Sequence, residues 1–372
     1  MNFKLICRII AILLLIVSGF MGTSLIVAWA YDEQEVIGAF LEPMLIAAAV
    51  SALFLIISRK ESTTLAARDG FLVVVLSWVS ASVLGAFPLY LSGEVESFVE
   101  ALFETVSGFT TTGATILTDI EALPKALLFW RSLTHWLGGM GIIVLTVAIF
   151  PILGIGGLQL IKAEAPGPTV DKITPKVTET AKILWMTYVA LSAAETILLL
   201  FGGMNLFDAL THTFGTVATG GFSPKAMSVG HYDSVFIHVV ITVFMVLAGV
   251  NFLLYYKLLL GRRDSLVLDS EFRSYIAIFL GGTVLLSLVL YGNGVYDSVG
   301  ESARYAGFQV ASILTTTGYT TTDFSLWPPF AKVALFVLMF TGGKEGSTGG
   351  GIKVVRIITL IKQAATEMKY LL

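Results

Sequence analysis

Three short stretches of the sequence combine threonine, glycine and other small residues in the same order. They read TTTGAT, ATGGFS and TTTGYT, and they occupy Thr110–Thr115, Ala218–Ser223 and Thr315–Thr320. Glycine permits backbone angles that turn carbonyl oxygens to one side, and threonine adds a hydroxyl oxygen on a stiff side chain. A ring of such oxygens can replace the hydration shell of a monovalent cation. Ca²⁺ and Mg²⁺ favour carboxylates, which these stretches lack.

The stretches align without gaps and belong to a longer internal repeat. Gly113, Gly221 and Gly318 correspond, at successive offsets of 108 and 97 residues. A single run of this kind is read more simply as a loop or a close helix contact, but three aligned runs favour a shared architecture. We therefore predict a cation filter made of three sets of four residues: Thr110, Thr111, Thr112 and Gly113; Ala218, Thr219, Gly220 and Gly221; and Thr315, Thr316, Thr317 and Gly318.

Each copy of the repeat reads as a long apolar helix, a short half-apolar segment, the filter stretch and a second long helix. The helical segments are predicted at Phe71–Leu91, Ser97–Phe109 and Leu127–Phe150; at Ala181–Gly203, Asn205–Val217 and Val235–Tyr256; and at Phe272–Tyr291, Ser302–Leu314 and Ala331 to near Leu360. The short segments have about 13 residues and would be roughly 20 Å long, whereas the hydrocarbon core of a bilayer is about 30 Å thick. We expect them to be re-entrant half-helices surrounded by protein or a watery cavity.

Composition agrees with a membrane protein. Of the 372 residues, 56% are hydrophobic and 13% are charged, whereas about a quarter of a soluble domain is charged. Two more helices, Ile9–Ala28 and Pro43–Ile57, precede the repeats. The predicted fold is an all-α polytopic membrane protein with two N-terminal helices and three helix–pore-loop–helix repeats around a pseudo-fourfold axis. The predicted regions are 1–69, 70–158 (repeat 1), 159–260 (a cytoplasmic loop and repeat 2) and 261–372 (repeat 3).

Charge sets the expected orientation. The predicted spans place 17 Lys and Arg residues on one face and 5 on the other, so the first face, with the N-terminus, is predicted to be cytoplasmic. Ile9–Ala28 is interpreted as a retained helix rather than a signal peptide, because no clear cleavage site follows it. The net charge of −3 favours no nucleic-acid partner. A single cysteine, Cys7, excludes an internal disulfide and a cysteine-based zinc site.

The last predicted helix contains a glycine-rich stretch. Thr341–Gly351 includes six glycines, and each costs a helix about 1 kcal/mol relative to alanine. We therefore predict a break here, with a simple kink or a packing seam as the alternative. A phosphate-binding loop is rejected, because Gly351 is followed by Ile352 rather than by lysine and no strand precedes the stretch.

Three motifs resemble the pore-forming subunits of the Trk/Ktr/HKT potassium transporter superfamily, and in particular its bacterial Trk branch. They are SGFTTTGAT at Ser107–Thr115, FWRSLTHWLGGMG at Phe129–Gly141 and GSTGGGIK at Gly346–Lys353. The resemblance implies a K⁺ pore in a bacterial or archaeal plasma membrane, with K⁺ as the transported ion and no organic cofactor. It also implies a homodimer and a ring of cytosolic nucleotide-binding regulatory subunits (TrkA-like). Glycine at the filter positions goes with potassium preference in this family.

The same resemblance assigns a role to the glycine-rich stretch. It implies a gate below the filter that obstructs the pore and moves, and the gate residues predicted here are Lys344, Gly346, Gly349, Gly350 and Gly351. Two features depart from the family pattern. Lys344 and Glu345 are charged, so we expect them in an aqueous cavity where they alter ion occupancy or gating. The family's fourth repeat is not found, so we expect a fragment, a truncated frame or part of a split protein that does not conduct alone.

Several polar residues in apolar segments have two interpretations. Arg131 and His135 suit structural contacts more than an influence on ion entry, and His212 suits a structural role more than ion ligation. His231 and His238 are seven residues apart with no visible third metal ligand. Glu195 suits a hydrogen-bonded helix contact more than a role in transport, although an intramembrane carboxylate always raises the second possibility.

The function that these features favour is a monovalent cation pore that prefers potassium. Sodium conduction and potassium–sodium symport remain alternatives within transport. A nonconducting three-repeat partner in a hetero-complex is an alternative of another class. An enzyme is disfavoured, because the sequence has no His/Cys/Asp cluster, nucleophile elbow or carboxylate pair at useful spacing.

Overall fold

The computed structural model describes residues 2–58, 67–141, 177–261 and 269–371. The chain divides into two compact units, Met1–Met186 and Thr187–Leu372, and each is described by itself. In the described residues every regular element is a helix, apart from one isolated β-bridge between Thr341 and Ile352.

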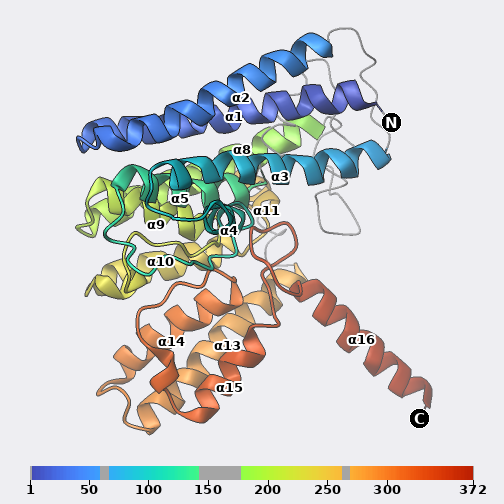
Figure 1. The fold of residues 1–372 in the computed structure, drawn as a ribbon. Coiled ribbons are helices and arrows are strands. Elements are labelled where there is room, and N and C mark those ends of the chain that lie inside the picture. Colours follow the sequence, from blue (N-terminus) through green and yellow to red (C-terminus); the bar gives the residue numbers. More distant parts are fainter. Residues whose placement is uncertain (1, 59–66, 142–176, 262–268, 372) are drawn as a thin grey trace. The chain divides into compact units, whose positions relative to one another are not determined.

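The first unit begins with three long helices that pack side by side (Figure 1). They are α1 (Phe3–Ala30), α2 (Ile37–Ile57) and α3 (Ala67–Leu91). The second predicted helix was expected to start at Pro43, which is wrong: α2 starts six residues earlier and contains Pro43. A proline inside a membrane helix is tolerated when neighbouring helices satisfy the freed backbone groups.

The same unit contains the short helix α4 (Phe98–Phe109) and the helix α5 (Lys125–Gly139). They pack against each other closely, because a Cβ at Gly138 would lie only 1.9 Å from the carbonyl oxygen of Phe109. Helix α5 covers the first part of the predicted Leu127–Phe150, and the part from position 142 lies outside the described residues.

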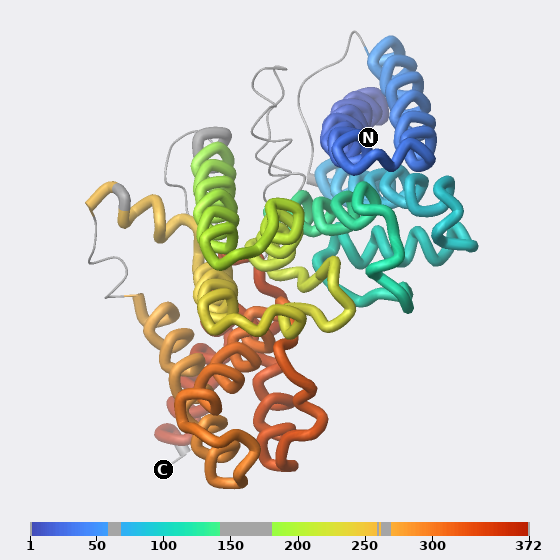
Figure 2. The backbone as a smooth tube through the Cα atoms, turned by 90° about the vertical axis from the view of Figure 1, so that its left-hand side faces the viewer, coloured from blue at the N-terminus to red at the C-terminus, as the bar shows by residue number. Residues whose placement is uncertain are grey.

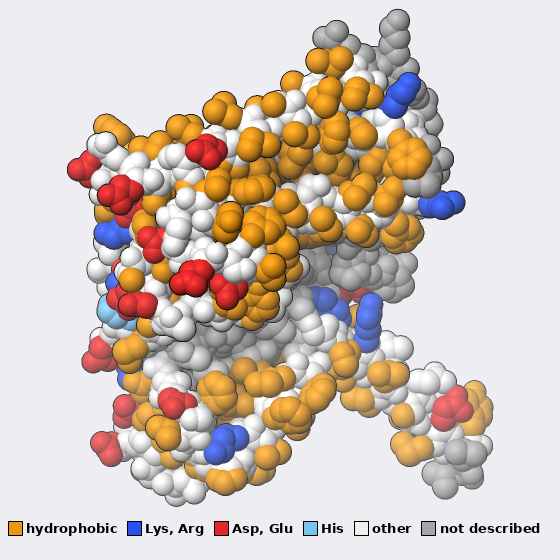
Figure 3. Space-filling model, in the orientation of Figure 1, with side chains coloured by type: hydrophobic (Ala, Val, Ile, Leu, Met, Phe, Trp, Pro, Cys, Tyr) orange, Lys and Arg blue, Asp and Glu red, His pale blue; other side chains and the backbone are white. Residues whose placement is uncertain are grey.

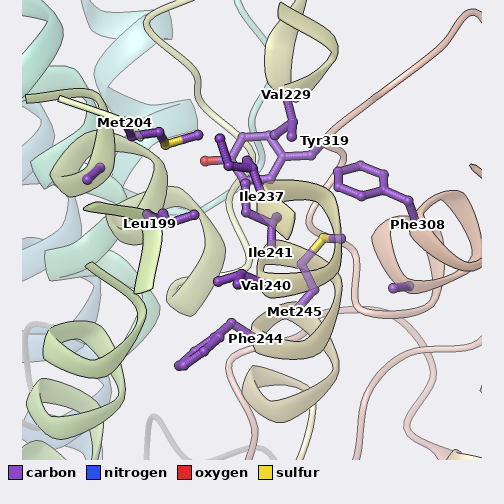
Figure 4. Packing of buried hydrophobic residues seen from close by; sticks show 12 residues of the cluster. Leu199, Met204, Val229, Ile237, Val240, Ile241, Phe244, Met245, Phe308 and Tyr319 are labelled. Carbon is purple, nitrogen blue, oxygen red and sulfur yellow. The ribbon is translucent and has the colours of Figure 1, made fainter. Parts of the chain in front are cut away.

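The second unit contains the helices of repeats 2 and 3. They are α8 (Val177–Phe201), which starts in the first unit, α9 (Leu206–Val217), α10 (Val235–Ala248), α11 (Phe252–Leu259), α13 (Ser270–Gly292), α14 (Val299–Leu314), α15 (Pro329–Leu338) and α16 (Val354–Leu371). A core cluster gathers apolar side chains from α8, α10 and α14 around Tyr319 (Figure 4). A second cluster joins α13, α14 and α15.

One predicted long helix, Val235–Tyr256, is wrong. It is broken into α10 and α11, which meet at an angle of 95° (Figure 2). At the break, Asn251 accepts a hydrogen bond from the Leu253 amide (2.8 Å) and caps α11. The freed backbone groups are satisfied by the glycine-rich stretch: the Lys344 amide donates to Gly249 O (2.8 Å), and the Phe252 amide donates to Gly346 O (3.2 Å).

The predicted break in the last helix of repeat 3 is confirmed. Helix α15 ends at Leu338 and α16 begins at Val354. The ends of the intervening loop are held together, because the Gly342 amide donates to Ile352 O at 2.8 Å. No side chain fits at Gly342, where a Cβ would lie 1.9 Å from Gly350 O.

The helices have the length and surface of membrane spans. Within the described ranges, five helices are long and apolar enough to cross a membrane, and the bent pair α10–α11 would make a sixth. In the first unit, hydrophobic side chains cover the flanks of α1–α3, and acidic side chains gather at the end where α1 passes into α2 (Figure 3). Lys4 and Arg8 lie at the opposite end of α1. This is the pattern of a polytopic helical membrane protein.

Candidate ion-coordinating site

Each filter stretch follows a half-helix that a polar side chain caps. Ser97 Oγ accepts from the Val99 amide (3.2 Å), Asn205 Oδ1 from the Asp208 amide (2.9 Å) and Ser298 Oγ from the Glu301 amide (3.0 Å). These caps satisfy the first free N–H groups of α4, α9 and α14. The start of α14 was predicted at Ser302, which is wrong: the helix begins at Val299, because Ser298 and Glu301 form its N-terminal capping turn.

All three half-helices end in the same way, on a threonine with a left-handed backbone. The φ angles of Thr111, Thr219 and Thr316 are 53°, 54° and 60°. In repeat 1, the Thr112 amide donates to Ser107 O (2.9 Å), and equivalent bonds close α9 and α14. This is a helix C-terminal motif whose left-handed position normally holds glycine. A β-branched residue there is strained by about 1–3 kcal/mol, and this strain recurs at the equivalent position of all three repeats.

The filter glycine follows two residues later and is also left-handed. The φ angles of Gly113, Gly221 and Gly318 are 76°, 81° and 85°. At Gly221 space is restricted as well, because a Cβ would lie 2.0 Å from Thr317 O. Filters 2 and 3 therefore touch at this glycine, and no side chain fits between them.

Further contacts join filters 2 and 3 in the second unit. The Gly230 amide donates to Thr320 O (3.0 Å), and Tyr319 Oη reaches Phe222 O (3.0 Å). The structure thus brings the predicted sets Ala218–Gly221 and Thr315–Gly318 together. The set Thr110–Gly113 lies in the first unit and has the same backbone form there.

In the first unit a buried carboxylate supports filter 1. Glu104 accepts from Thr115 Oγ1 (2.8 Å) and the Ile116 amide (3.1 Å), and it pairs with Arg131 Nε at 2.5 Å. His135 Nδ1 donates to Gly108 O at 2.7 Å. Arg131 and His135 thus make structural contacts to α4, as predicted. Sequence reasoning missed Glu104, although a carboxylate inside an apolar half-helix is a signal worth following.

The glycine-rich loop lies directly against filters 2 and 3. Thr348 Oγ1 donates to Val217 O (3.1 Å), the last residue of α9, and lies 3.3 Å from Ala248 O. The Gly350 amide donates to Thr316 Oγ1 (2.7 Å), and a Cβ at Gly349 would lie 3.0 Å from Thr315 O. The predicted gate residues Gly349 and Gly350 are therefore in contact with the filter stretches, and Gly351 follows them with a φ of 70°.

Lys344 and Gly346 lie at the other side of this loop, beside the α10–α11 break. The expectation that Lys344 sits in an aqueous cavity is wrong, since its side chain is 5% exposed and forms ion pairs with Asp269 and, at 3.8 Å, with Glu271. Glu271 Oε1 also accepts from the Glu345 amide (3.0 Å) and the Val355 amide (3.1 Å). We call Asp269, Glu271 and Lys344 the clasp, because they fix the loop to the start of α13.

Asp269 of the clasp has a lowered pKa. Burial raises the pKa of Asp269, but hydrogen bonds from Lys344 and the Phe272 amide act more strongly together, so the pKa lies below its usual value. The opposite charge of Lys344 favours the ionised form of this carboxyl.

Two more histidines, His212 and His238, make structural contacts. His212 is fully buried, with Nδ1 donating to Asp208 O (2.8 Å) and Nε2 beside Ser223 Oγ (3.1 Å). His238 Nε2 donates to Tyr232 O at 2.8 Å. In the part of the chain that the structure describes, no group of three or more His, Cys, Asp and Glu residues could hold a metal ion. Glu195 is fully buried in α8.

Fold and site together define an all-helical polytopic membrane protein with three short helices, each followed by a left-handed threonine and a left-handed glycine. Comparison with known proteins identifies its family. The TrkH family model, described as a cation transport protein, matches residues 37–371, and the chain belongs to this family.

Named relatives match most or all of the chain. It is 44% identical to the Trk system potassium uptake protein TrkH of Salmonella typhimurium, and also 44% identical to that of Escherichia coli K12, covering 100% of this chain and 77% of each relative. It is 41% identical to Escherichia coli TrkG over 84% of this chain and 65% of that protein. The crystal structure of the potassium transporter TrkH from Vibrio parahaemolyticus superposes with a TM-score of 0.88 at 38% identity, over 100% of this chain and 77% of that one.

Proposed function

We propose that this chain is a Trk-type potassium uptake subunit that conducts K⁺ through backbone carbonyls of its pore loops. The filter consists of Thr110–Gly113, Ala218–Gly221 and Thr315–Gly318. Support comes from relatives that match along the whole chain and are named potassium uptake proteins. The chain also shares its fold with the solved potassium transporter TrkH of Vibrio parahaemolyticus.

One observation carries the site assignment. The three half-helices all end on a threonine with φ between 53° and 60°, two residues before a glycine with positive φ. A single strained threonine has many explanations, but three at equivalent positions indicate a backbone shape that the repeats share. Such a backbone presents carbonyl oxygens, and the C-terminal end of each half-helix adds partial negative charge. Both features stabilise a partly dehydrated monovalent cation.

The glycine-rich loop is the gate in this proposal. Support comes from its bonds to Val217 O and Thr316 Oγ1, at the base of filters 2 and 3. The clasp anchors one side of it to α13, while Gly346 and Gly351, with positive φ, allow it to turn. The loop obstructs the ion path when these bonds are made and opens it when they break.

The assembly is also a proposal. The subunit functions as a homodimer with a cytosolic ring of nucleotide-binding regulatory subunits of the TrkA type, and its N-terminus is cytoplasmic. Support comes from relatives named as parts of a Trk system and from the basic residues at the start of α1 opposite the acidic turn after it. The subunit moves an ion and is not an enzyme.

Complementation of a bacterium that lacks potassium uptake tests the proposal. The chain is expressed alone and joined to the part of Escherichia coli TrkH that it does not cover, and growth at limiting K⁺ and Rb⁺ uptake are measured. We expect the joined protein to restore growth and to prefer K⁺ and Rb⁺ over Na⁺. The proposal is overturned if the joined protein reaches the membrane folded but restores neither growth nor uptake.

A further inference from the structure

A serine in two of the three half-helices is bonded to its own filter. Ser107 Oγ donates to Ala114 O, and Ser312 Oγ donates to Tyr319 O, each at 2.6 Å. The accepting residue follows the filter glycine directly in both repeats. This hydroxyl latch therefore holds the end of the filter against the half-helix that precedes it.

Repeat 2 lacks the serine. The aligned position is Gly215, and the carbonyl equivalent to those of Ala114 and Tyr319 is Phe222 O. At this place Tyr319 of repeat 3 supplies a hydroxyl instead, with Oη 3.0 Å from Phe222 O and 3.0 Å from His212 O. A Cβ on Gly215 would lie 2.1 Å from Tyr319 Oη, so the hydroxyl occupies the space of the missing side chain.

The surroundings hold this hydroxyl in place. Tyr319 is fully buried, and its ring lies among Ile237, Phe308 and other apolar side chains (Figure 4). His212 O also accepts from Thr216 Oγ1 at 2.8 Å, so it has a second donor within its own helix. Tyr319 Oη is within hydrogen-bonding distance of both carbonyls, so it can donate its proton to Phe222 O, as the serines donate theirs in repeats 1 and 3.

We propose that Tyr319 is a positioning residue that latches filter 2 from filter 3, replacing the serine that repeat 2 lacks. The role in selectivity rests on the proposed ion-conducting function. In repeats 1 and 3 the hydroxyl that holds the filter comes from the half-helix of the same repeat, but in repeat 2 it comes from Tyr319 of repeat 3. A displacement of filter 3 consequently moves the carbonyls of filter 2, and the tyrosine hydroxyl contributes to discrimination between K⁺ and Na⁺.

Four variants separate the hydroxyl from the space that it fills. Tyr319→Phe removes the hydroxyl and introduces the residue that filter 2 already has at the aligned position, Phe222. Gly215→Ser alone collides with Tyr319 Oη. Gly215→Ser combined with Tyr319→Phe returns a hydroxyl to the half-helix, as in repeats 1 and 3. Gly215→Ala combined with Tyr319→Phe adds the same Cβ without a hydroxyl and is the matched control, since any crowding against the ring is shared.

Two quantities are measured for each variant in the joined protein: the ratio of K⁺ to Na⁺ uptake, and the midpoint of thermal unfolding in detergent. Loss of one hydrogen bond corresponds to a change of up to about tenfold in an equilibrium. We therefore expect Tyr319→Phe to lower the uptake ratio several-fold and to lower the unfolding midpoint. The serine double variant should recover both quantities, and the alanine double variant should not.

Two results would overturn the latch. The first is that Tyr319→Phe has the same uptake ratio and unfolding midpoint as the unchanged protein. The second is that the serine double variant recovers neither quantity beyond the alanine double variant. The unfolding midpoint does not depend on transport. If the unchanged protein showed no preference for K⁺, the proposed function would fail, while the midpoints would still decide whether the tyrosine and serine hydroxyls are interchangeable.

Discussion

Gly221 offers the sharpest perturbation of the filter. Replacing it with alanine places a Cβ 2.0 Å from Thr317 O, whereas a carbon and a carbonyl oxygen in contact are normally about 3.3 Å apart. Filter 2 or filter 3 must therefore move by about 1 Å or more. In enzymes, a shift of that size around a reacting centre can lower the reaction rate about 100-fold. For this filter we expect K⁺ uptake to fall by at least about tenfold.

Gly203 provides a matched control in the same repeat. Its φ is +92°, close to the +81° of Gly221, but nothing lies within 4 Å of a Cβ placed there. Both alanine variants incur the left-handed strain, about 1–2 kcal/mol, and only Gly221→Ala incurs the collision. Rb⁺ uptake is measured for both at matched amounts in the membrane. Equal uptake by the two variants would refute the claim that this glycine shapes the ion path.

Three more predictions concern the supports of the site. Asp269→Asn keeps the helix cap but removes the charge that faces Lys344. The loop should loosen, and K⁺ leak through the protein in liposomes should rise; an unchanged leak would count against the clasp. Arg131→Met leaves Glu104 buried without its ion-pair partner, which should cost about 3–5 kcal/mol of stability, and adding Glu104→Gln should recover part of the loss in thermal unfolding. Thr348→Val removes the loop's hydroxyl bonds to two helix ends, so open probability in single-channel recordings should increase, and a decrease would contradict the gate assignment.

The half-helices were the most predictable elements because their signals are local. In repeats 1 and 2, Ser97 and Asn205 precede an apolar run, and both are N-caps in the structure, within one residue of the predicted starts. In repeat 3, both Ser298 and Ser302 are candidate N-caps. Ser298 is the N-cap in the structure, and Glu301, three residues later, completes its capping turn. Both residues of this pattern are visible in the sequence.

The contacts between distant segments were not predictable in this way. The bend after α10 has a local signal in the cap residue Asn251, but it is also stabilised by an amide of Lys344 that is far away in the sequence. The partner of Lys344 is Asp269, 75 residues away. Periodicity and composition report on one segment at a time, so the ion pair and the bonds from the loop to the bend have no local signature.

The central claim is that the carbonyl oxygens of the three filter stretches bind a dehydrated alkali ion. Anomalous diffraction from crystals of the joined protein grown with Rb⁺ or Tl⁺ tests it directly. We expect ion peaks within coordination distance of carbonyl oxygens from Thr110–Gly113, Ala218–Gly221 and Thr315–Gly318. Peaks that lie elsewhere, or filter stretches without any bound ion at saturating concentration, would contradict it.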